Sequence, residues 1–193
     1  DCVPRTNEYN YMFIQAYQAG KCWSYVGRNS RGRRISRMNL GADYCWSDRT
    51  IRHEIGHALG LIHEHQRPDR DKFVTIHYEN VQNEMTYVFD IRRIGDWDTT
   101  LQKTHYDFHS VMHYPWNAYN INRNDGIPNN DLPTIEPKNK YRDIFREAWG
   151  PGGHKNKELT SADKTTVARI YGYRNPKSEF QRNYNRMLEE GEN

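Results

Sequence analysis

Hydrophobic side chains near the start of the chain alternate with a period of two. Between residues 9 and 17, aromatic residues fall on one side of the pattern and residues such as Met12 and Ile14 on the other, which predicts a β-strand. Two further strands are predicted at residues 22–28 and 35–40, after glycine-containing breaks. We expect the 35–40 strand to lie at a sheet edge, where free N–H and C=O groups can hold an extended peptide.

The next segment, residues 48–59, has the spacing of an amphipathic helix. At 100° per residue its hydrophobic side chains fall within about 80° of one another. These are Ile51, Ile55, Ala58 and Leu59. His53 and His57 lie on the opposite side, and Ser47 and Asp48 are candidate N-caps. We therefore expect one face of this helix to pack against the protein core and the opposite face to carry functional residues.

Later in the chain the pattern is less regular. We predict a short extended segment at residues 73–77 and a partly helical one at 79–89, with Val81, Met85 and Val88 on one face. Residues 116–137 are dense in Asn, Asp, Gly and Pro, which predicts a long surface excursion. Residues 160–163 fit a capping box and predict a helix at 162–171. Its packed side chains are expected to be Val167, Ile170 and Tyr171.

Candidate chemistry lies on the 48–59 helix. His53 and His57 are one turn and about 6 Å apart on the same side, which suits two ligands of one metal. A catalytic zinc site commonly uses three protein ligands and keeps a position for water, and His63 is the third candidate. In a continuous helix His63 would lie about 15 Å beyond His53. Gly60 can adopt the left-handed conformation that ends the helix and turns the chain back.

Glu54 follows the first candidate ligand directly. Zinc lowers the pKa of a bound water toward about 7, and a neighbouring carboxylate can take its proton, so Glu54 is the candidate general base. A bare His-Glu-x-x-His is a weak signal, but the pattern extended to Gly60 and His63 predicts zinc-dependent hydrolysis. The remaining histidines lack such spacing and are expected to be surface or packing residues. They are His65, His77, His105, His109, His113 and His154.

The extended motif is that of the metzincins, which carry a downstream Met-turn. Residues 110–114, Ser-Val-Met-His-Tyr, supply a candidate turn. Within the metzincins the chain resembles the astacin family, in which glutamate follows the third histidine, as Glu64 follows His63. Two further stretches are similar to that family: residues 64–71 and 22–28. The resemblance covers about residues 4–171.

This resemblance implies roles for residues that spacing alone does not single out. Met112 would lie beneath the metal as a hydrophobic floor without binding it. Tyr114 would be an additional zinc ligand that swings away during turnover, and its hydroxyl can donate to a developing oxyanion. In the family the mature N-terminal amine is buried near the glutamate that corresponds to Glu64. The strand and helix that usually precede the segment matching residues 4–6 are not in this sequence.

The resemblance also assigns the cysteines. Cys22 and Cys45 would form a disulfide, which implies an oxidising, extracellular location. Cys2 would have no partner within the chain. Family members are made as zymogens, so a propeptide is an expected partner.

Composition excludes other classes of function. The net charge is +3 without a long basic run, so no nucleic-acid partner is expected. An apolar segment of the roughly 20 residues needed to span a bilayer is missing from the sequence, so no membrane partner is expected. The 193 residues fit one globular domain, which we expect to be monomeric.

Together these features predict an α+β, metzincin-type fold in a single domain, residues 1–173. Residues 1–64 would carry a mixed twisted sheet and the active-site helix, and residues 65–173 an irregular half with the Met-turn and a C-terminal helix, with a cleft between them. Residues 174–193 would be a polar tail. The predicted activity is that of a zinc metalloendopeptidase acting on internal peptide bonds of extracellular proteins. Two alternatives remain: a catalytically silent zinc-binding module that recognises peptides, and an exopeptidase, for which the sequence shows no evident clamp.

Overall fold

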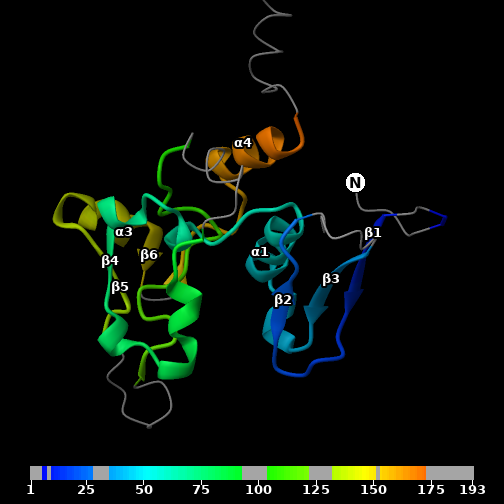
Figure 1. Cartoon of the computed structure of the whole chain (residues 1–193), viewed down its shortest axis with the longest axis horizontal. Coiled ribbons are helices and arrows are strands. Elements are labelled where there is room, and N and C mark those ends of the chain that lie inside the picture. The colour runs from blue at the N-terminus through cyan, green and yellow to red at the C-terminus, as the bar shows by residue number, and fades with distance from the viewer. Residues whose placement is uncertain are drawn as a thin grey trace, which may run out of the picture.

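The computed structural model describes most of the chain, namely residues 6–7, 10–27, 35–92, 104–121, 132–150 and 153–172. The N-terminal strands and the first helix lie on one side of the molecule, and the segments from the middle of the chain on the other (Figure 1). The predictions for Cys2 and for the tail at 174–193 fall outside the described residues.

A three-stranded mixed sheet forms from β1 (Tyr11–Gln15), β2 (Cys22–Ser24) and β3 (Ile35–Leu40). The strand order is β1-β3-β2, with β1 parallel and β2 antiparallel to β3. The three predicted strands are therefore present, although β1 and β2 are shorter than predicted. The predicted edge position of residues 35–40 is wrong, because β3 is the central strand of this sheet.

A buried polar residue lies in this central strand. The side chain of Asn39 is buried. Its amide nitrogen donates to the backbone carbonyls of Gln18 and Lys21, at 3.0 and 2.6 Å, and its amide oxygen accepts from the Gln18 N–H at 3.1 Å. Because the loop between β1 and β2 satisfies the amide, burying it in a central strand carries no penalty of an unpaired polar group.

Helix α1 (Asp48–Ala58) packs against this sheet. The side chain of Ser47 accepts from the Thr50 N–H and caps the helix, as one of the two candidate caps predicted. The predicted hydrophobic face contacts the buried cluster of the sheet through Ile51, Ile55 and Ala58. A disulfide between Cys22 and Cys45 joins β2 to the 3₁₀ turn that precedes α1. The sheet, the turn and the helix thus form one packed unit.

The other side of the molecule contains short elements. Strands β4 (Val74–Ile76) and β5 (Ile135–Pro137) pair antiparallel, as do β6 (Trp149–Gly150) and β7 (Gly153–His154). Helix α3 (Arg142–Ala148) lies between β5 and β6 in the chain. Among the described residues, short 3₁₀ helices connect the other elements: Asp43–Trp46, Glu64–Gln66, Arg70–Lys72, Tyr78–Asn80, Asn83–Phe89 and Asn139–Tyr141.

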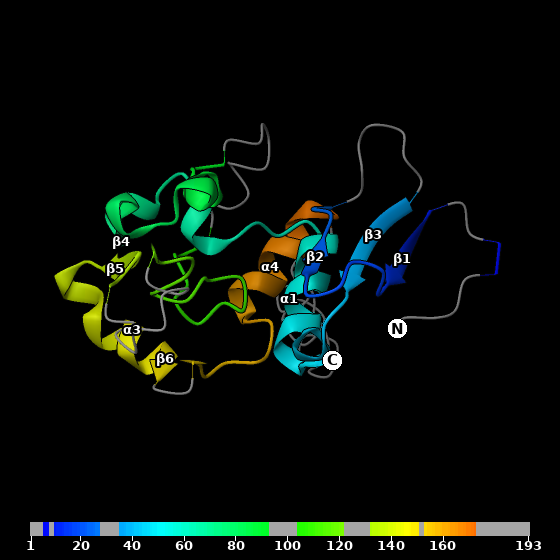
Figure 2. The ribbon, with the colours of Figure 1, turned by 90° about the horizontal axis from the view of Figure 1, so that it is seen from below.

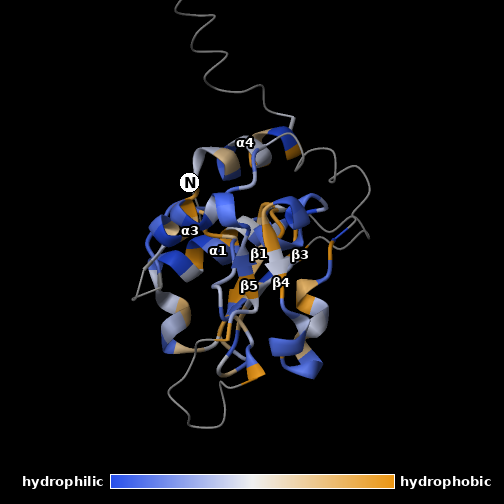
Figure 3. Cartoon of the chain, turned by 90° about the vertical axis from the view of Figure 1, so that its left-hand side faces the viewer, coloured by the Kyte–Doolittle hydropathy of each residue, from blue (hydrophilic) through white to orange (hydrophobic). Residues whose placement is uncertain are grey.

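A hydrophobic cluster around β4 and β5 holds these short elements together. Figure 3 shows hydrophobic residues at the two strands and hydrophilic residues over much of the helices. The predicted face of residues 79–89 belongs to the cluster: Val81 is buried, and Met85 and Val88 pack against it. That segment is 3₁₀ rather than α-helical.

The prediction of a surface excursion at residues 116–137 is wrong at both of its ends. Ala118, Thr134 and Ile135 are buried, and Ile135 begins β5. The Thr134 hydroxyl donates to the carbonyls of Trp116 and Ala118, at 3.2 and 2.9 Å. These bonds join the two ends of the segment. Both ends are therefore buried, although the segment is rich in polar residues. Residues 122–131 lie outside the described residues.

Helix α4 (Ser161–Ile170) returns over the junction between the two sides (Figures 1 and 2). The predicted capping box is present, because Thr160 and Asp163 exchange side-chain to backbone hydrogen bonds. Val167 and Ile170 pack as predicted, but Tyr171 is 43% exposed, contrary to the prediction. Tyr171 follows the last helical residue and so leaves the packed face. Within the described residues, each helix is too short or too polar to cross a lipid bilayer.

Candidate metal centre

The chain reverses at the end of α1 as the sequence predicts. Gly60 has a φ of 108°, in the region that favours glycine. Its N–H donates to the His57 carbonyl at 2.8 Å, and the Leu61 N–H donates to the Gly56 carbonyl at 2.9 Å. This pair of bonds is the Schellman arrangement that ends a helix. The turn carries the chain back along α1 and brings His63 to the histidines of the helix.

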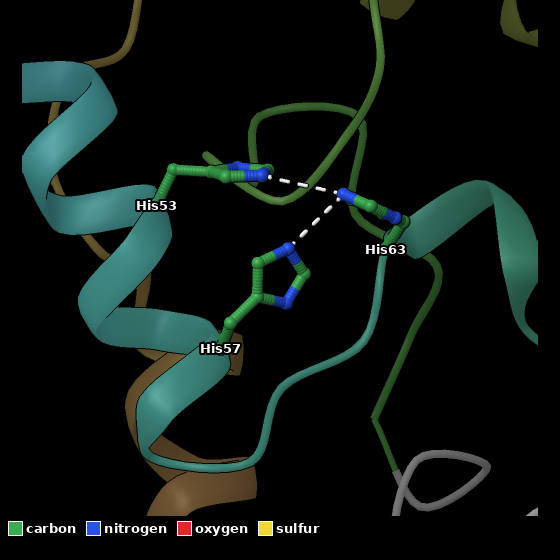
Figure 4. Close-up of side chains that lie close together, drawn as sticks. All are labelled: His53, His57 and His63. Carbon is green, nitrogen blue, oxygen red and sulfur yellow. Dashed lines mark hydrogen bonds between the residues drawn. The ribbon is translucent and has the colours of Figure 1, made fainter. Parts of the chain in front are cut away.

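Three histidines meet at this turn, and Figure 4 shows their rings converging. The ligand atoms of His53, His57 and His63 all lie within 4.8 Å of one another. Nε2 of His63 is 3.1 Å from Nε2 of His57 and 3.3 Å from Nε2 of His53. Zn–N bonds of about 2.0–2.1 Å in a tetrahedral site separate two nitrogen ligands by about 3.3 Å. The spacing therefore fits a small divalent cation.

Hydrogen bonds to Nδ1 set the tautomer of each ring. Each Nδ1 faces an oxygen that only accepts: His53 faces the Val111 carbonyl at 2.8 Å, His57 the Leu61 carbonyl at 2.8 Å, and His63 Oε1 of Gln66 at 3.0 Å. Each Nδ1 must then carry the proton, which leaves the Nε2 lone pair for a metal.

Burial makes these rings neutral. It lowers the pKa of His57 to about 4 and holds the pKa of His53 and of His63 well below the usual histidine range. Three neutral imidazoles therefore direct lone pairs at one point without a proton to bridge them. A cation at that point converts this repulsion into bonding, so the donor set fits a metal ion.

Glu54 lies beside the cluster and lines the same cavity, which has a volume of about 470 Å³. Its side chain is 4% exposed, and Oε2 has no hydrogen-bond partner among the described residues. Burial raises the pKa of Glu54 to about 7. A carboxyl group with that pKa can both take and return a proton near neutral pH.

Tyr114 also lines this cavity. Its ring centroid is 4.2 Å from that of His63 and 4.3 Å from that of His65. Burial raises the pKa of Tyr114 above the usual tyrosine range, so it is a neutral phenol unless a cation lies next to it. The structure thus brings Tyr114 to the histidine cluster, where its hydroxyl can donate a hydrogen bond.

The predicted Met-turn packs against helix α1, which carries His53 and His57. Met112 is 1% exposed, and a Cβ added to Gly56 would lie 2.6 Å from the Met112 sulfur. Arg49, one turn before His53 on α1, donates to the carbonyls of Val111 and His113, at 3.2 and 3.3 Å. The turn is therefore fixed against the helix that carries two of the candidate ligands.

Replacing Gly56 with alanine tests this close approach. In an exposed helix interior the change gains about 1 kcal/mol of stability. Overpacking a tight core costs about 1–3 kcal/mol. Since the added methyl meets the Met112 sulfur, we expect Gly56→Ala to lower the free energy of unfolding in urea. In a Met112→Ala background the same substitution should be stabilising. A stabilising effect in the wild-type background would contradict this packing.

Glu64 occupies a separate buried position. Its Oε1 accepts from Nη1 of Arg67 at 2.9 Å and from the Asp107 N–H at 2.8 Å. Its own N–H donates to the Met112 carbonyl at 3.2 Å. Glu64 thus connects the segment after His63 to the Met-turn. The role implied by resemblance, as partner of the mature N-terminal amine, stays a prediction.

Among the described residues, the candidate metal cluster contains none of the other six histidines. His65 and His113 are fully buried and act in packing and hydrogen bonding. Nε2 of His113, for example, lies 2.9 Å from the Tyr106 hydroxyl. These positions agree with the expectation that the remaining histidines are surface or packing residues.

Sequence reasoning missed three residues of the site. Gln66 fixes the His63 tautomer. Its position three residues after His63 is a local signal by which the sequence could have identified it. Arg49 holds the Met-turn from a position one turn before His53. Arg92 lines the cavity although it is 29 residues from His63, and no spacing rule connects the two.

The fold and the cluster define an α+β domain of the metzincin type, with three histidines that could hold a metal ion on a helix and after the turn that follows it. A family model described as Astacin (Peptidase family M12A) matches residues 1–171. The chain belongs to the astacin family.

Individual proteins show the same similarity. The chain is 36% identical over 172 residues to zinc metalloproteinase nas-14 of Caenorhabditis elegans, covering 88% of the chain and 29% of that protein. High choriolytic enzyme 1 of Oryzias latipes is 37% identical over 135 residues, which cover 68% of the chain and 46% of that protein. The solved structure of that hatching enzyme, a zinc-protease, superposes with a TM-score of 0.68 at 27% identity, covering 89% of the chain and 74% of the other. The chain spans less than a third of the length of nas-14.

Proposed function

We propose that this chain is the catalytic part of a zinc metalloendopeptidase that hydrolyses internal peptide bonds of extracellular proteins. The observation that carries the proposal is the convergence of three neutral imidazole Nε2 atoms beside the buried carboxyl group of Glu54. Membership of a peptidase family and similarity to proteins named zinc metalloproteinases support it.

His53, His57 and His63 would hold the zinc ion. When bound there, zinc lowers the pKa of a water molecule and polarises the carbonyl group to be attacked. The partners of Nδ1, which are Val111, Leu61 and Gln66, orient the rings and increase their basicity. The protein therefore supplies a pre-oriented set of donors.

Glu54 is the proposed general base. It takes a proton from the attacking water and returns it to the amine that leaves. Burial prepares it for both steps, because a pKa of about 7 makes donation and acceptance similarly favourable near neutral pH. The unpartnered Oε2 leaves the carboxylate available to substrate and water.

Tyr114 would be a further ligand of the zinc ion, one that the metal can also release. As a neutral phenol its hydroxyl then donates to the oxyanion that forms from the substrate carbonyl. Met112 contributes the hydrophobic support beneath the site and binds no metal.

The position of strand β2 supports the proposal that the substrate is a polypeptide. Its residues Trp23 and Ser24 line the cavity that contains Glu54, and within the described sheet β2 pairs along one edge with β3. The other edge of a strand can hold an extended peptide by backbone hydrogen bonds. A peptide bound in that way passes through the site, as cleavage of internal bonds requires.

The disulfide between Cys22 and Cys45 supports the proposal that the protein is secreted, because such bonds persist in oxidising compartments. By membership of its family, the protein is proposed to be made as a zymogen with a propeptide. It is further proposed to act as a monomer.

A fluorescence-quenched peptide blocked at both ends tests the activity. We expect the zinc-loaded protein to cleave it, a chelator to stop cleavage, and added zinc to restore it. Cleavage only of peptides with a free terminus would establish an exopeptidase instead. Zinc binding without cleavage of blocked or free peptides, or of casein, would establish a silent recognition module and refute the proposal.

A further inference from the structure

We propose that Tyr119 is a positioning residue for Tyr114: its hydroxyl accepts a hydrogen bond from the Tyr114 phenol and so competes with the metal for that group. This inference rests on the proposed function of Tyr114 as a metal ligand. Both tyrosines line the cavity that contains Glu54. Their ring centroids lie 5.8 Å apart, with an angle of 50° between the ring planes.

The backbone of Tyr119 adopts a conformation that costs free energy. Its φ is 52°, and within the described ranges it is the one residue other than glycine with a positive φ. A residue with a Cβ is strained in this left-handed region, and such strain is concentrated at functional sites. Contacts with the surrounding structure must therefore hold Tyr119 in place.

Those contacts come from the preceding part of the chain. The Gln82 N–H donates to the Tyr119 carbonyl at 2.9 Å, and the Gln82 side chain donates to the Asn120 carbonyl at 3.0 Å. Asn120 is buried and pairs with Val81 in an antiparallel bridge. The Tyr119 ring is partly buried against the hydrophobic cluster around β4 and β5. The fold thus fixes where Tyr119 meets the cavity.

Tyr114 is the other member of this contact. Burial is the largest cause of its raised pKa, and the next two causes are the neighbouring Tyr119 phenol and a side-chain hydrogen bond to it. That hydrogen bond raises the pKa of Tyr114 because it favours the neutral phenol, which keeps its proton to donate. A buried tyrosine hydroxyl usually has a partner of this kind.

The Tyr114 hydroxyl would therefore have two competing partners. A phenol that binds a cation does so with its proton weakened or lost, whereas Tyr119 stabilises the protonated, unbound phenol. A residue that stabilises the unbound phenol lowers the fraction of Tyr114 bound to metal. One net hydrogen bond changes such an equilibrium by about two- to tenfold. Tyr119 would in this way keep the Tyr114 hydroxyl free to donate to an oxyanion.

Copper(II) in place of zinc makes this equilibrium visible. Copper(II) binds nitrogen and oxygen donors more tightly than zinc does, and a phenolate bound to it absorbs visible light by charge transfer. Tyr119→Phe keeps the packed ring and removes only the hydroxyl. We expect it to raise the ratio of bound to unbound Tyr114 by about two- to tenfold and so to strengthen the band. Tyr114→Phe should lose the band.

Zinc affinity, measured by competition with a chromophoric chelator, covers the case in which Tyr114 is already mostly bound in wild type. The copper band then has little room to grow. Tyr119→Phe should instead tighten zinc binding by the same factor of about two to ten. The two measurements together detect the effect wherever the wild-type equilibrium lies.

Two controls separate positioning from a general structural effect. In a Tyr114→Phe background, Tyr119→Phe should leave zinc affinity unchanged, because the two hydroxyls act through each other. An equal change in both backgrounds would overturn the proposal. Tyr141→Phe removes a hydroxyl from a ring that packs against the same hydrophobic cluster but does not line the cavity. It should alter neither the copper band nor zinc affinity.

The remaining outcomes distinguish this inference from the proposed function. A weaker band in Tyr119→Phe, or no change in either the band or zinc affinity, would overturn the role of Tyr119 and leave the metal site and the peptidase assignment standing. If neither wild type nor Tyr119→Phe shows a band that depends on Tyr114, the ligand role of Tyr114 is wrong and this inference fails with it. Cleavage of the blocked peptide is measured separately and decides the peptidase assignment.

Discussion

Glu54→Gln should bind zinc as wild type does and lose turnover by a factor of about 10²–10⁴, the usual contribution of a positioned general base. Glutamine keeps the size of the side chain but cannot accept the proton of the attacking water. Zinc content after dialysis and kcat on a blocked peptide are the two measurements.

The surroundings of Glu54 sharpen this expectation. Since Oε2 has no partner among the described residues, the buried carboxyl group is held at a cost to stability. The neutral amide relieves part of that cost, so Glu54→Gln should unfold at the same temperature as wild type or above it. A site that gives up stability for activity behaves in this way.

Glu147→Gln supplies the control, because this residue is exposed on α3 and does not line the cavity. It should change neither zinc content nor kcat. If Glu54→Gln cleaves the peptide at the wild-type rate, Glu54 is not the base and the proposed mechanism is wrong.

Local physics explains which parts of the site were predictable. The α1 helix, its Ser47 cap and its end at Gly60 follow from side-chain spacing and from the conformational freedom of glycine. Because that turn alone brings His63 to the helix, the whole metal cluster could be predicted from a single stretch of sequence. The capping box at Thr160 is local in the same sense.

Contacts between distant segments were less predictable. The central strand β3 buries Asn39, and this burial is possible because a loop about twenty residues earlier in the chain binds its amide. The ends of the 116–137 segment are buried because Thr134 reaches carbonyls on the other side of it. Arg92 reaches the cavity through a bond to Gln66. In each case the hydrogen-bond partner lies far along the chain. Neither hydrophobic periodicity nor secondary-structure propensity indicates such a contact.

Removing one candidate ligand provides the other large expected effect. His53→Ala should abolish tight zinc binding, peptide cleavage and the rise in melting temperature that zinc produces in wild type. A ligand present at 100 times its Kd stabilises the folded state by about 2.7 kcal/mol. Alanine keeps α1 intact, since it is the best helix former. The measurements are zinc stoichiometry and thermal unfolding with and without zinc.

The metal-free proteins should behave differently from the zinc-loaded ones. Without zinc, wild type directs three imidazole lone pairs at one point, a repulsion that His53→Ala partly removes. The variant also loses the bond from His53 Nδ1 to the Val111 carbonyl, whose net worth is about 1 kcal/mol. Because these changes oppose each other, we expect the metal-free melting temperatures to lie close together while the zinc-dependent shift disappears. His105→Ala, at an exposed histidine, should retain the full shift. Full zinc stabilisation of His53→Ala would show that the metal lies elsewhere.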